Sequence, residues 1–445
     1  MQNILFVHPY KIQGLSDYSI MSMGSFAIAN NLISHGNNVI VYNAPMEISI
    51  NKEIDVINNI QCIIDRELID ITMISLQWYE HYLGAIEIAR EIKLNNEKIV
   101  IIMGGITASL LRKQILSRYS FIDYIVFGDA EYPVESLVEY LNNNRNASCP
   151  PNVAYIDSNN TYYESHKFIK TNFNFMDYTT IDCLHNNKSY LKCDLNGYKE
   201  NNIRNFWLLM GMGCKYDCTY CGGSKKAHKT IFGRECFIAR NIDNIKDDIS
   251  KLKTMAVEQI SFSHDFDFFD SKYQESIFRR LSDSSIKLYY ESFQIPSNLV
   301  INNLITNNVQ AHIAISALTG SFTLRKQNGK HFDNSELILC IKKCIEYGVE
   351  VSIFFSLNLE NQVLATINET ITLINKIKEL NRNIKIIIQP ILPFEIASKQ
   401  CRVSEEEFIS SLEEYLRYKN RYQYFIEKEP ILGEYANLIY NQCNL

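Results

Sequence analysis

Short apolar runs of strand length alternate with helix-like segments along the first 145 residues of the chain. The strand-like runs are residues 4–8, 38–42, 69–76, 98–103 and 124–127. Apolar residues recur at helical spacing in residues 22–34, 84–94, 110–117 and 132–141. Strands that alternate with helices in this way form a parallel sheet covered on both faces. We therefore predict an α/β fold that begins with a doubly wound, Rossmann-like domain over residues 1–145, with a ligand at the carboxyl ends of its strands.

The same alternation returns in residues 201–400, after a stretch of weaker periodicity. Its strand-like runs are residues 206–210, 259–263, 286–291, 310–316, 350–356 and 384–390. Helical spacing is found in residues 242–255, 273–281, 334–346 and 365–380. An eight-unit barrel takes about 250 residues, so six βα units predict a partial (β/α)6 barrel.

Two further segments complete the predicted organisation. Residues 153–156 and 162–167 could form a small hairpin, and we interpret residues 146–200 as a linker that wraps around the second domain. Residues 401–445 are predicted to form a helical extension, in which Ser404 and Glu407 have the spacing of a capping box.

The composition is that of a globular protein. A chain of 445 residues with 46% hydrophobic and 21% charged residues predicts two or three domains. The formal net charge of −6 provides no broad basic field, so we expect no nucleic-acid partner. The N-terminus lacks the features of a signal peptide, and no apolar run approaches the roughly 18 residues that span a membrane. We therefore predict a cytoplasmic protein without a membrane partner.

Three of the twelve cysteines are gathered in the segment Cys214-Lys-Tyr-Asp-Cys218-Thr-Tyr-Cys221. The C-x3-C-x2-C spacing supplies three thiolates, one fewer than a tetrahedral metal or a cubane cluster accepts, and an open position is typical of a reactive centre. Two glycines follow at once, which would let the backbone approach a bound ligand closely. A zinc site with His228 as the fourth ligand, or a set of packed thiols, is the alternative interpretation.

This segment resembles the signature of the radical S-adenosylmethionine (radical SAM) superfamily. The resemblance implies that Cys214, Cys218 and Cys221 hold a [4Fe-4S] cluster whose fourth iron binds SAM. In that family one electron from the cluster cleaves SAM, and the resulting 5′-deoxyadenosyl radical abstracts hydrogen from a substrate C–H bond. It further implies an electron donor such as flavodoxin or ferredoxin, and a small-molecule or peptide substrate.

The resemblance also implies contacts with SAM, which are carried over by position along the chain. The implied SAM-binding residues are Tyr220, Gly222, Gly223, Ser224, Glu291, Ser316 and Arg325. Arg325 is expected in a loop, where it could pair with a carboxylate. His264, Asp265 and Asp267 end the second barrel strand and are expected to face the substrate cavity. For Glu291 and Ser316 an ordinary polar residue at a strand end is the alternative, and for the two acids a merely solvated role is.

The first domain is similar to the cobalamin-binding domain found upstream of many radical SAM domains. The similarity lies in residues 4–9, in Ser75, in the pair Gly104-Gly105 and in Gly128, and it implies that these strand ends contact cobalamin. No Asp-x-His-x-x-Gly segment is present to supply a histidine ligand for cobalt. A Rossmann-like shell that binds no cobalamin is the alternative.

Three functions fit these features. The first is cobalamin-dependent C-methylation of a metabolite or peptide in natural-product biosynthesis. The second is epimerisation of a peptide, in which a cysteine thiol returns hydrogen to the substrate radical. The candidate hydrogen donors are Cys340 and Cys344, which share a helix face, and Cys401. Cys340 and Cys344 could instead be packed core thiols. The third is a non-catalytic cobalamin or cluster sensor.

Overall fold

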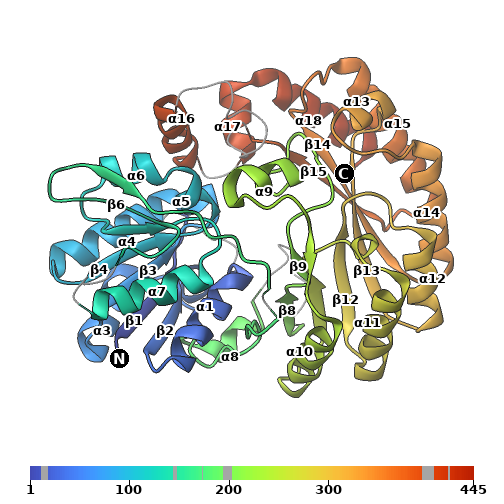
Figure 1. The fold of residues 1–445 in the computed structure, drawn as a ribbon. Helices are drawn as coiled ribbons and strands as arrows, with labels where there is room; N and C mark the ends of the chain where they lie inside the picture. The colour runs from blue at the N-terminus through green and yellow to red at the C-terminus, as the bar shows by residue number, and fades with distance from the viewer. Residues whose placement is uncertain (12–18, 144–147, 173, 194–202, 393–404, 419–420) are drawn as a thin grey trace. The chain divides into compact units, whose positions relative to one another are not determined.

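The computed structural model describes residues 1–11, 19–143, 148–172, 174–193, 203–392, 405–418 and 421–445. The chain divides into two compact units (Figure 1). Unit 1 consists of Met1–Asn205, Lys229–Arg234 and Ser404–Leu416. Unit 2 consists of Phe206–His228, Glu235–Val403 and Arg417–Leu445.

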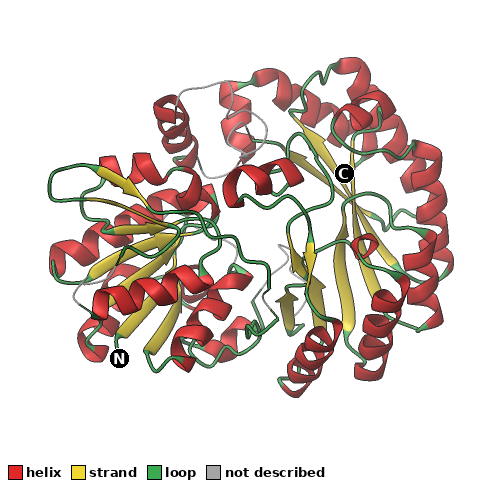
Figure 2. Ribbon diagram, in the orientation of Figure 1, coloured by secondary structure: helices red, strands yellow, loops and turns green. Residues whose placement is uncertain are grey.

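Unit 1 is built on a seven-stranded sheet in the order β2-β1-β3-β4-β5-β6-β7. Its parallel strands are β1 (Asn3–His8), β2 (Asn38–Asn43), β3 (Ile71–Ser75), β4 (Val100–Gly104) and β5 (Tyr124–Val126). The helices that cover it include α1 (Met23–Ser34), α3 (Val56–Glu67), α4 (Tyr82–Asn95) and α7 (Glu131–Asn142). Helices lie on both faces of this sheet (Figure 2). The predicted doubly wound, Rossmann-like domain is confirmed.

Buried apolar runs explain why these strands are central. Every residue of β3 is buried, and three residues of β4 are too, because helices cover both faces of a parallel sheet. The register pairs Ser75 with Gly104 and Gly104 with Val126. The carboxyl ends of three neighbouring strands therefore meet at one edge.

The segment predicted to wrap the second domain lies instead in unit 1. The predicted hairpin forms from β6 (Val153–Ile156) and β7 (Tyr162–Glu164), and it adds to the sheet beside β5 in antiparallel orientation. At the opposite edge, Leu184 forms a parallel bridge with Val41 of β2. Unpaired backbone groups at sheet edges attract further strands, which explains why this segment closes the sheet of its own unit.

Unit 2 contains a six-stranded sheet in the order β15-β14-β13-β12-β11-β8. Its strands are β8 (Asn205–Leu208), β11 (Gln259–Phe262), β12 (Lys287–Ser292), β13 (Ala311–Leu318), β14 (Glu350–Leu357) and β15 (Lys385–Pro390). The intervening helices are α10 (Ile242–Thr254), α11 (Ser271–Ser284), α12 (Asn298–Thr306), α13 (Phe322–Gln327), α14 (Asn334–Glu346) and α15 (Leu364–Leu380). The predicted partial barrel with six strands is confirmed, with strand ends within two residues of those predicted.

The two faces of this sheet differ in character. The register aligns Glu291 with Ala314, and Ser356 with Gln389, so these side chains point to one face, which we call the inner face. Glu291 and Gln389 are solvent-accessible there. Neighbouring residues such as Tyr290 point to the opposite, outer face and are buried beneath the helices. A sheet whose accessible face is polar is suited to a ligand cavity.

The C-terminal extension is helical, as predicted, in α16 (Glu405–Leu416), α17 (Arg421–Lys428) and α18 (Pro430–Cys443). α16 belongs to unit 1, whereas α17 and α18 belong to unit 2. The capping box expected of Ser404 and Glu407 lies outside the residues whose side chains are described.

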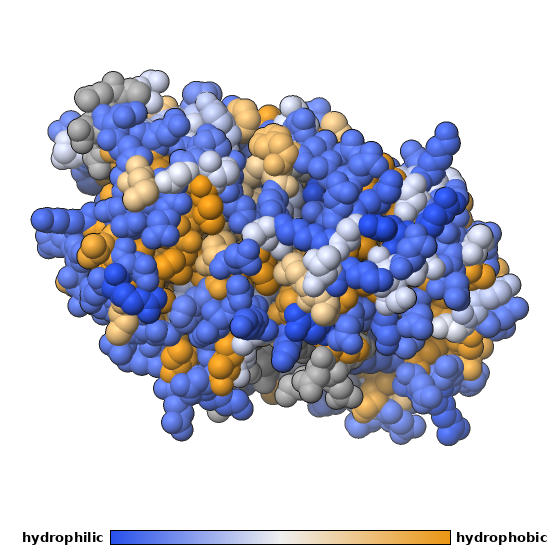
Figure 3. All heavy atoms as spheres, turned by 90° about the horizontal axis from the view of Figure 1, so that it is seen from below, coloured by the Kyte–Doolittle hydropathy of each residue, from blue (hydrophilic) through white to orange (hydrophobic). Residues whose placement is uncertain are grey.

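The molecular surface is mainly hydrophilic on the face shown in Figure 3, where apolar side chains form small separate areas. Within the described ranges, no helix combines the length and the apolar character needed to cross a membrane.

Candidate cluster and cofactor sites

The cysteine loop begins and ends at a short two-stranded antiparallel stem. β9 (Gly211–Met212) pairs antiparallel with β10 (Ile238–Ala239), so residues 213–237 form an excursion from the barrel. A Cβ atom on Gly211 would lie 2.5 Å from the ring of Phe237, so only glycine allows the two sides of the stem to approach this closely. The strand that leads into the loop is thus fixed just before the first cysteine.

The three thiols are shielded from bulk solvent. Cys218 is buried, and Cys214 and Cys221 are half-buried. Burial, together with the neighbouring cysteines, raises the pKa of Cys214 to about 11. Two of the sulfurs accept hydrogen bonds from backbone amides. Tyr216 N donates to Cys214 Sγ at 3.4 Å, and Gly223 N donates to Cys221 Sγ at 3.3 Å. Amide donors of this kind stabilise thiolates once metal binding has displaced the protons.

A buried lysine that the motif does not reveal lies beside the cysteine loop. The segment Asn328-Gly329-Lys330 packs on the loop, since Thr219 Oγ1 donates to Asn328 Oδ1 at 2.8 Å and Gly329 abuts the backbone of Cys218. Lys330 is 2% exposed and donates to the carbonyl of Phe293. Burial lowers the pKa of Lys330, while negative charge on Cys218 and Cys221 opposes that shift. Its ammonium group supplies positive charge where three thiolates collect.

Tyr220 connects the cysteine loop to the inner face of the barrel. Its hydroxyl lies close to the side chain of Ser316 of β13, and its ring packs on a buried apolar cluster of Leu318, Leu324, Leu359 and Ile391. Glu291 lies on the same inner face; although its side chain is solvent-accessible, the surrounding barrel desolvates the carboxylate and raises its pKa, and the charge of Lys330 opposes the rise. The structure therefore brings together three residues that the sequence predicted near the cluster, Tyr220, Ser316 and Glu291. It adds Lys330, which the sequence did not predict.

Unit 1 presents a glycine-lined edge at the carboxyl ends of β3, β4 and β5. Gly105 has a φ of +107°, and a Cβ atom there would lie 2.5 Å from the carbonyl oxygen of Leu76. Ser109 Oγ donates to the carbonyl of Gly105 at 2.7 Å and accepts from the amide of Gly128 at 3.0 Å. Ser75 and Gly104 lie side by side in the register. The four predicted contact residues thus share one edge, and Ser109, which no motif pointed to, joins two of the turns.

Two family sequence models match the chain. The model for the B12 binding domain matches residues 16–138, and the model for the radical SAM superfamily matches residues 208–374. The uncharacterized protein MJ0966 of Methanocaldococcus jannaschii is 21% identical over 373 residues, which cover 83% of this chain and 75% of that protein. The chain contains a B12-binding domain followed by a radical SAM domain.

Solved structures share this fold at low sequence identity. The radical SAM methyltransferase TsrM from Kitasatospora setae, with tryptophan and a SAM analogue bound, has a TM-score of 0.66 and 13% identity, covering 84% of this chain and 70% of that one. The cobalamin-dependent SAM radical enzyme OxsB, with aqua-cobalamin and SAM bound, has a TM-score of 0.63 and 14% identity, covering 96% of this chain and 56% of that one. Both likenesses are likenesses of fold.

The cysteine loop fits the [4Fe-4S] cluster and SAM that a radical SAM domain implies. Three thiols from one loop, two amide donors and a buried ammonium group suit an anionic cluster with one open iron.

The small residues after Cys221 lead directly into α9 (Lys225–Phe232). A Cβ atom on Gly223 would have only Cys221 Sγ nearby, at 3.8 Å, so Gly223 leaves the approach to the loop uncrowded. Ser224 is buried, and its Oγ accepts from the amide of Ala227 at 3.3 Å. Ser224 thus begins the helix of the radical SAM domain, and its predicted contact with SAM stays a prediction.

Arg325 differs from the prediction in both place and partners. It lies in α13 rather than in a loop and is fully buried. Its guanidinium donates to the carbonyls of Ala317 and Phe332, each at 3.0 Å, to the carbonyl of Thr319, and to Asn334 Oδ1 at 2.7 Å. The fork of donors is occupied by backbone and amide oxygens around the end of β13 and not by a carboxylate of the described residues, and the predicted contact of Arg325 with SAM stays a prediction.

One of the two acids at the end of β11 also differs from the prediction. Asp265 is fully buried and accepts from the amides of Asp267 at 3.1 Å and Phe293 at 2.7 Å. Asp267 accepts from the amide of Ser297 at 2.9 Å. Asp265 thus holds the loop after β12 rather than facing a cavity, whereas Asp267 is half-buried and its predicted place in the substrate cavity stays a prediction. His264 is buried as well, against the cysteine loop.

The two candidate hydrogen donors that the structure describes do not lie with the inner-face residues near the cysteine loop. Cys340 and Cys344 are on the buried face of α14 and contact each other. Both lie near Tyr290, which points to the outer face of the sheet, opposite Glu291. Cys401 lies outside the described residues.

Proposed function

We propose that this protein is a cobalamin-dependent radical SAM enzyme that methylates a carbon atom of a metabolite or peptide. The observation that carries the proposal is the glycine-lined edge of the B12-binding domain, in the same chain as an intact cysteine loop. TsrM has also been solved with cobalamin and a [4Fe-4S] cluster bound, and OxsB with aqua-cobalamin. Cobalamin supplies a methyl carrier when it is bound, and SAM at the cluster supplies a radical.

The residues of the chain then have distinct tasks. Cys214, Cys218 and Cys221 would hold the cluster, and Lys330 would balance its charge. Tyr220, Ser316 and Glu291 would orient SAM on the inner face of the barrel, close to the loop. The polar groups on the inner face, including Gln389, would contact the substrate. A flavodoxin or ferredoxin would deliver the electron.

In the B12-binding domain, Ser75, Gly104, Gly105 and Gly128 would form the floor of the cobalamin site, where a bare backbone lets a large ligand approach. His8 offers no ligand for cobalt, because it is 0% exposed and its ring packs edge-on against Trp78 at 5.7 Å and His81 at 4.9 Å. Cobalamin would thus bind without a histidine below the cobalt.

Two features favour methylation over the alternatives. A peptide epimerase needs a hydrogen donor that reaches the substrate, and the two candidate donors among the described residues, Cys340 and Cys344, are buried on the outer face of the sheet. A sensor would not need the polar groups on the inner face or Tyr220 beside Ser316. Methylation asks only for residues that the two domains already present.

The test is anaerobic purification with added hydroxocobalamin, followed by measurement of iron, cobalamin and 5′-deoxyadenosine. We expect one cobalamin and one [4Fe-4S] cluster per chain, and 5′-deoxyadenosine from SAM under reducing conditions. The triple variant Cys214→Ala/Cys218→Ala/Cys221→Ala should lose the cluster and keep cobalamin. Reproducible exclusion of cobalamin by the wild-type protein would refute methylation and favour epimerisation. An intact cluster in the triple variant would refute the radical SAM site.

A further inference from the structure

A short chain of hydrogen bonds links the end of β11 to the peptide that precedes Cys214. The amide of Met210 donates to Ser263 Oγ at 3.1 Å, and Ser263 Oγ lies 2.6 Å from His264 Nδ1. His264 Nε2 lies 3.1 Å from the carbonyl oxygen of Gly213. Because a carbonyl only accepts, Nε2 carries the proton and Nδ1 accepts from the Ser263 hydroxyl. Each donor from Met210 to His264 therefore has an acceptor.

The imidazole of His264 is held in this orientation by its surroundings. The side chain is 8% exposed, and its ring lies 5.1 Å from that of Phe237 and 6.0 Å from that of Phe268. Lys215, in the cysteine loop, donates from Nζ to the carbonyl of Phe268 at 2.6 Å. Burial lowers the pKa of His264 to about 4, so the ring is neutral near pH 7, which is the form that this chain of bonds requires.

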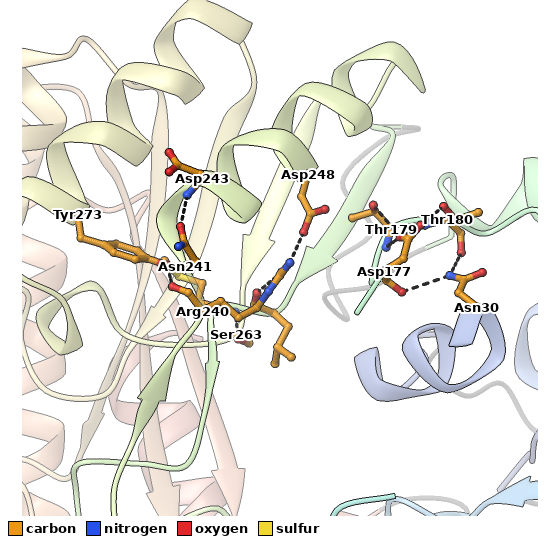
Figure 4. Close-up of polar contacts among 12 residues, drawn as sticks. Asn30, Asp177, Thr179, Thr180, Arg240, Asn241, Asp243, Asp248, Ser263 and Tyr273 are labelled. Atoms are coloured by element: carbon orange, nitrogen blue, oxygen red, sulfur yellow. Dashed lines mark hydrogen bonds and ion pairs between the residues drawn. The ribbon is translucent and has the colours of Figure 1, made fainter. Parts of the chain in front are cut away.

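A buried arginine braces the start of the same chain of bonds (Figure 4). The amide of Arg240 donates to the carbonyl of Met210, and Nη1 donates to that of Leu209, both at 2.9 Å. Arg240 is 2% exposed and pairs through Nη2 with Asp248 at 2.9 Å, while its own carbonyl accepts from Tyr273 at 3.1 Å. Met210 is therefore fixed through both its amide and its carbonyl.

We propose that Ser263 and His264 are positioning residues of the iron–sulfur site. By holding the carbonyl of Gly213, they set the direction in which the chain enters the loop and presents the thiolate of Cys214. Gly213 has a φ of +92°, in a region that glycine enters and leaves easily, so without this bond the peptide would rotate. The inference rests on the proposed cluster at Cys214, Cys218 and Cys221. Partners that orient metal ligands typically contribute about 10- to 100-fold to metal affinity.

Two substitutions separate the hydrogen bonds of His264 from its packing. His264→Phe keeps a ring between Phe237 and Phe268 but can neither donate to Gly213 nor accept from Ser263. His264→Gln offers an amide N–H and a carbonyl at similar reach. Ser263→Ala removes only the hydroxyl that joins the amide of Met210 to His264. The matched control is His312→Phe, since His312 is a partly buried barrel histidine that hydrogen-bonds Ser352 at 3.0 Å.

The readouts are iron and sulfide per chain after anaerobic reconstitution, the rate of iron loss to a ferrous chelator, and the EPR spectrum of the reduced cluster. The thermal midpoint of each apo-protein reports general damage. We expect His264→Phe to lose iron at least about tenfold faster than wild type and to show an altered EPR spectrum. Ser263→Ala should change in the same direction by less, and His264→Gln and His312→Phe should stay close to wild type.

Three results would overturn the inference. One is wild-type cluster stability in His264→Phe. Another is equal loss in His264→Phe and His312→Phe, which would mean general destabilisation. The third is equal loss in His264→Gln and His264→Phe, which would assign the effect to packing. If the wild-type protein itself binds no cluster, the proposed function fails instead, so the two failures are distinguishable.

Discussion

Asp265 is a carboxylic acid without solvent contact, placed within reach of the charges of Asp267 and Lys330. Burial first, and then the negative charge of Asp267, raises its pKa from the usual 3.8 to about 6, although backbone amides favour the ionised form. A single side chain near the cysteine loop therefore changes its charge near pH 6, within the pH range in which proteins are usually studied.

The raised pKa of Asp265 predicts a definite pH dependence of stability. Between about pH 4 and pH 6 the folded protein binds more protons than the unfolded chain, so stability from this group is lost as pH rises through about 6. The loss is about 3 kcal/mol at most. Asp265→Asn cannot titrate, so its free energy of unfolding should fall less than that of wild type over this range. Urea unfolding of the two apo-proteins at a series of pH values tests this, and parallel profiles would contradict it.

Turns after parallel strands are the elements that shape the cofactor edge of unit 1. The chain after β4 must reverse within one residue, at Gly105, before α5 (Ile106–Leu110) begins. The turn is then tied to the next one through Ser109 and Gly128. Because the backbone itself forms the edge, any side chain added there changes both the turn and the surface that faces a ligand.

Gly105→Ala and Gly36→Ala form a matched pair that isolates this effect. Both glycines have positive φ, of +107° and +80°, but a Cβ atom on Gly36 would meet nothing within 4 Å. We expect Gly36→Ala to cost about 1–2 kcal/mol through backbone strain alone. Gly105→Ala adds the contact with Leu76, so it should cost several kcal/mol and weaken cobalamin binding. Thermal denaturation and a cobalamin titration test this. Equal effects of the two substitutions would show that the turn accommodates a Cβ atom at residue 105.

At the scale of the whole molecule, the chain passes from one unit to the other within α9, directly after the cysteine loop. The returning segment is fastened within unit 1 by Arg234, which donates from Nη2 to both carboxylate oxygens of Asp129, at 2.7 and 2.8 Å. Both side chains are 3% exposed. Lys170 and Glu131 form a second buried pair beside it, at 3.3 Å.

Arg234→Met should therefore destabilise unit 1 severely, since it leaves Asp129 buried without its guanidinium. The expected cost is about 3–5 kcal/mol. Arg279→Met is the control, because the pair of Arg279 with Glu275 is exposed, at 67% and 49%, and such pairs contribute about 0–1 kcal/mol. Hydrogen exchange of residues 124–131 and the thermal midpoint would measure the difference. A cost for Arg234→Met no larger than that for Arg279→Met would mean that water or another group compensates Asp129.

The sequence by itself determined the order of elements, the two sheets and the cysteine loop. A short stretch of sequence specifies each of these features. The spacing of apolar residues predicts the strands and helices, and three cysteines within eight residues predict the cluster site. Ser75, Gly104, Gly105 and Gly128 could also be placed, because each follows a recognisable strand and the carboxyl ends of parallel strands meet at one edge.

Only the tertiary structure decided which polar groups meet. Lys330 and Cys218 are far apart in the sequence, and no local pattern places an ammonium group beside a thiol. Arg325 and Asp265 were expected to face ligands, yet each is surrounded by backbone groups from turns that only the folded chain brings near. Cys340 and Cys344 share a helix face, but the sheet decides that this face is core. Charge and hydrogen bonding depend on spatial neighbours, and periodicity does not encode them.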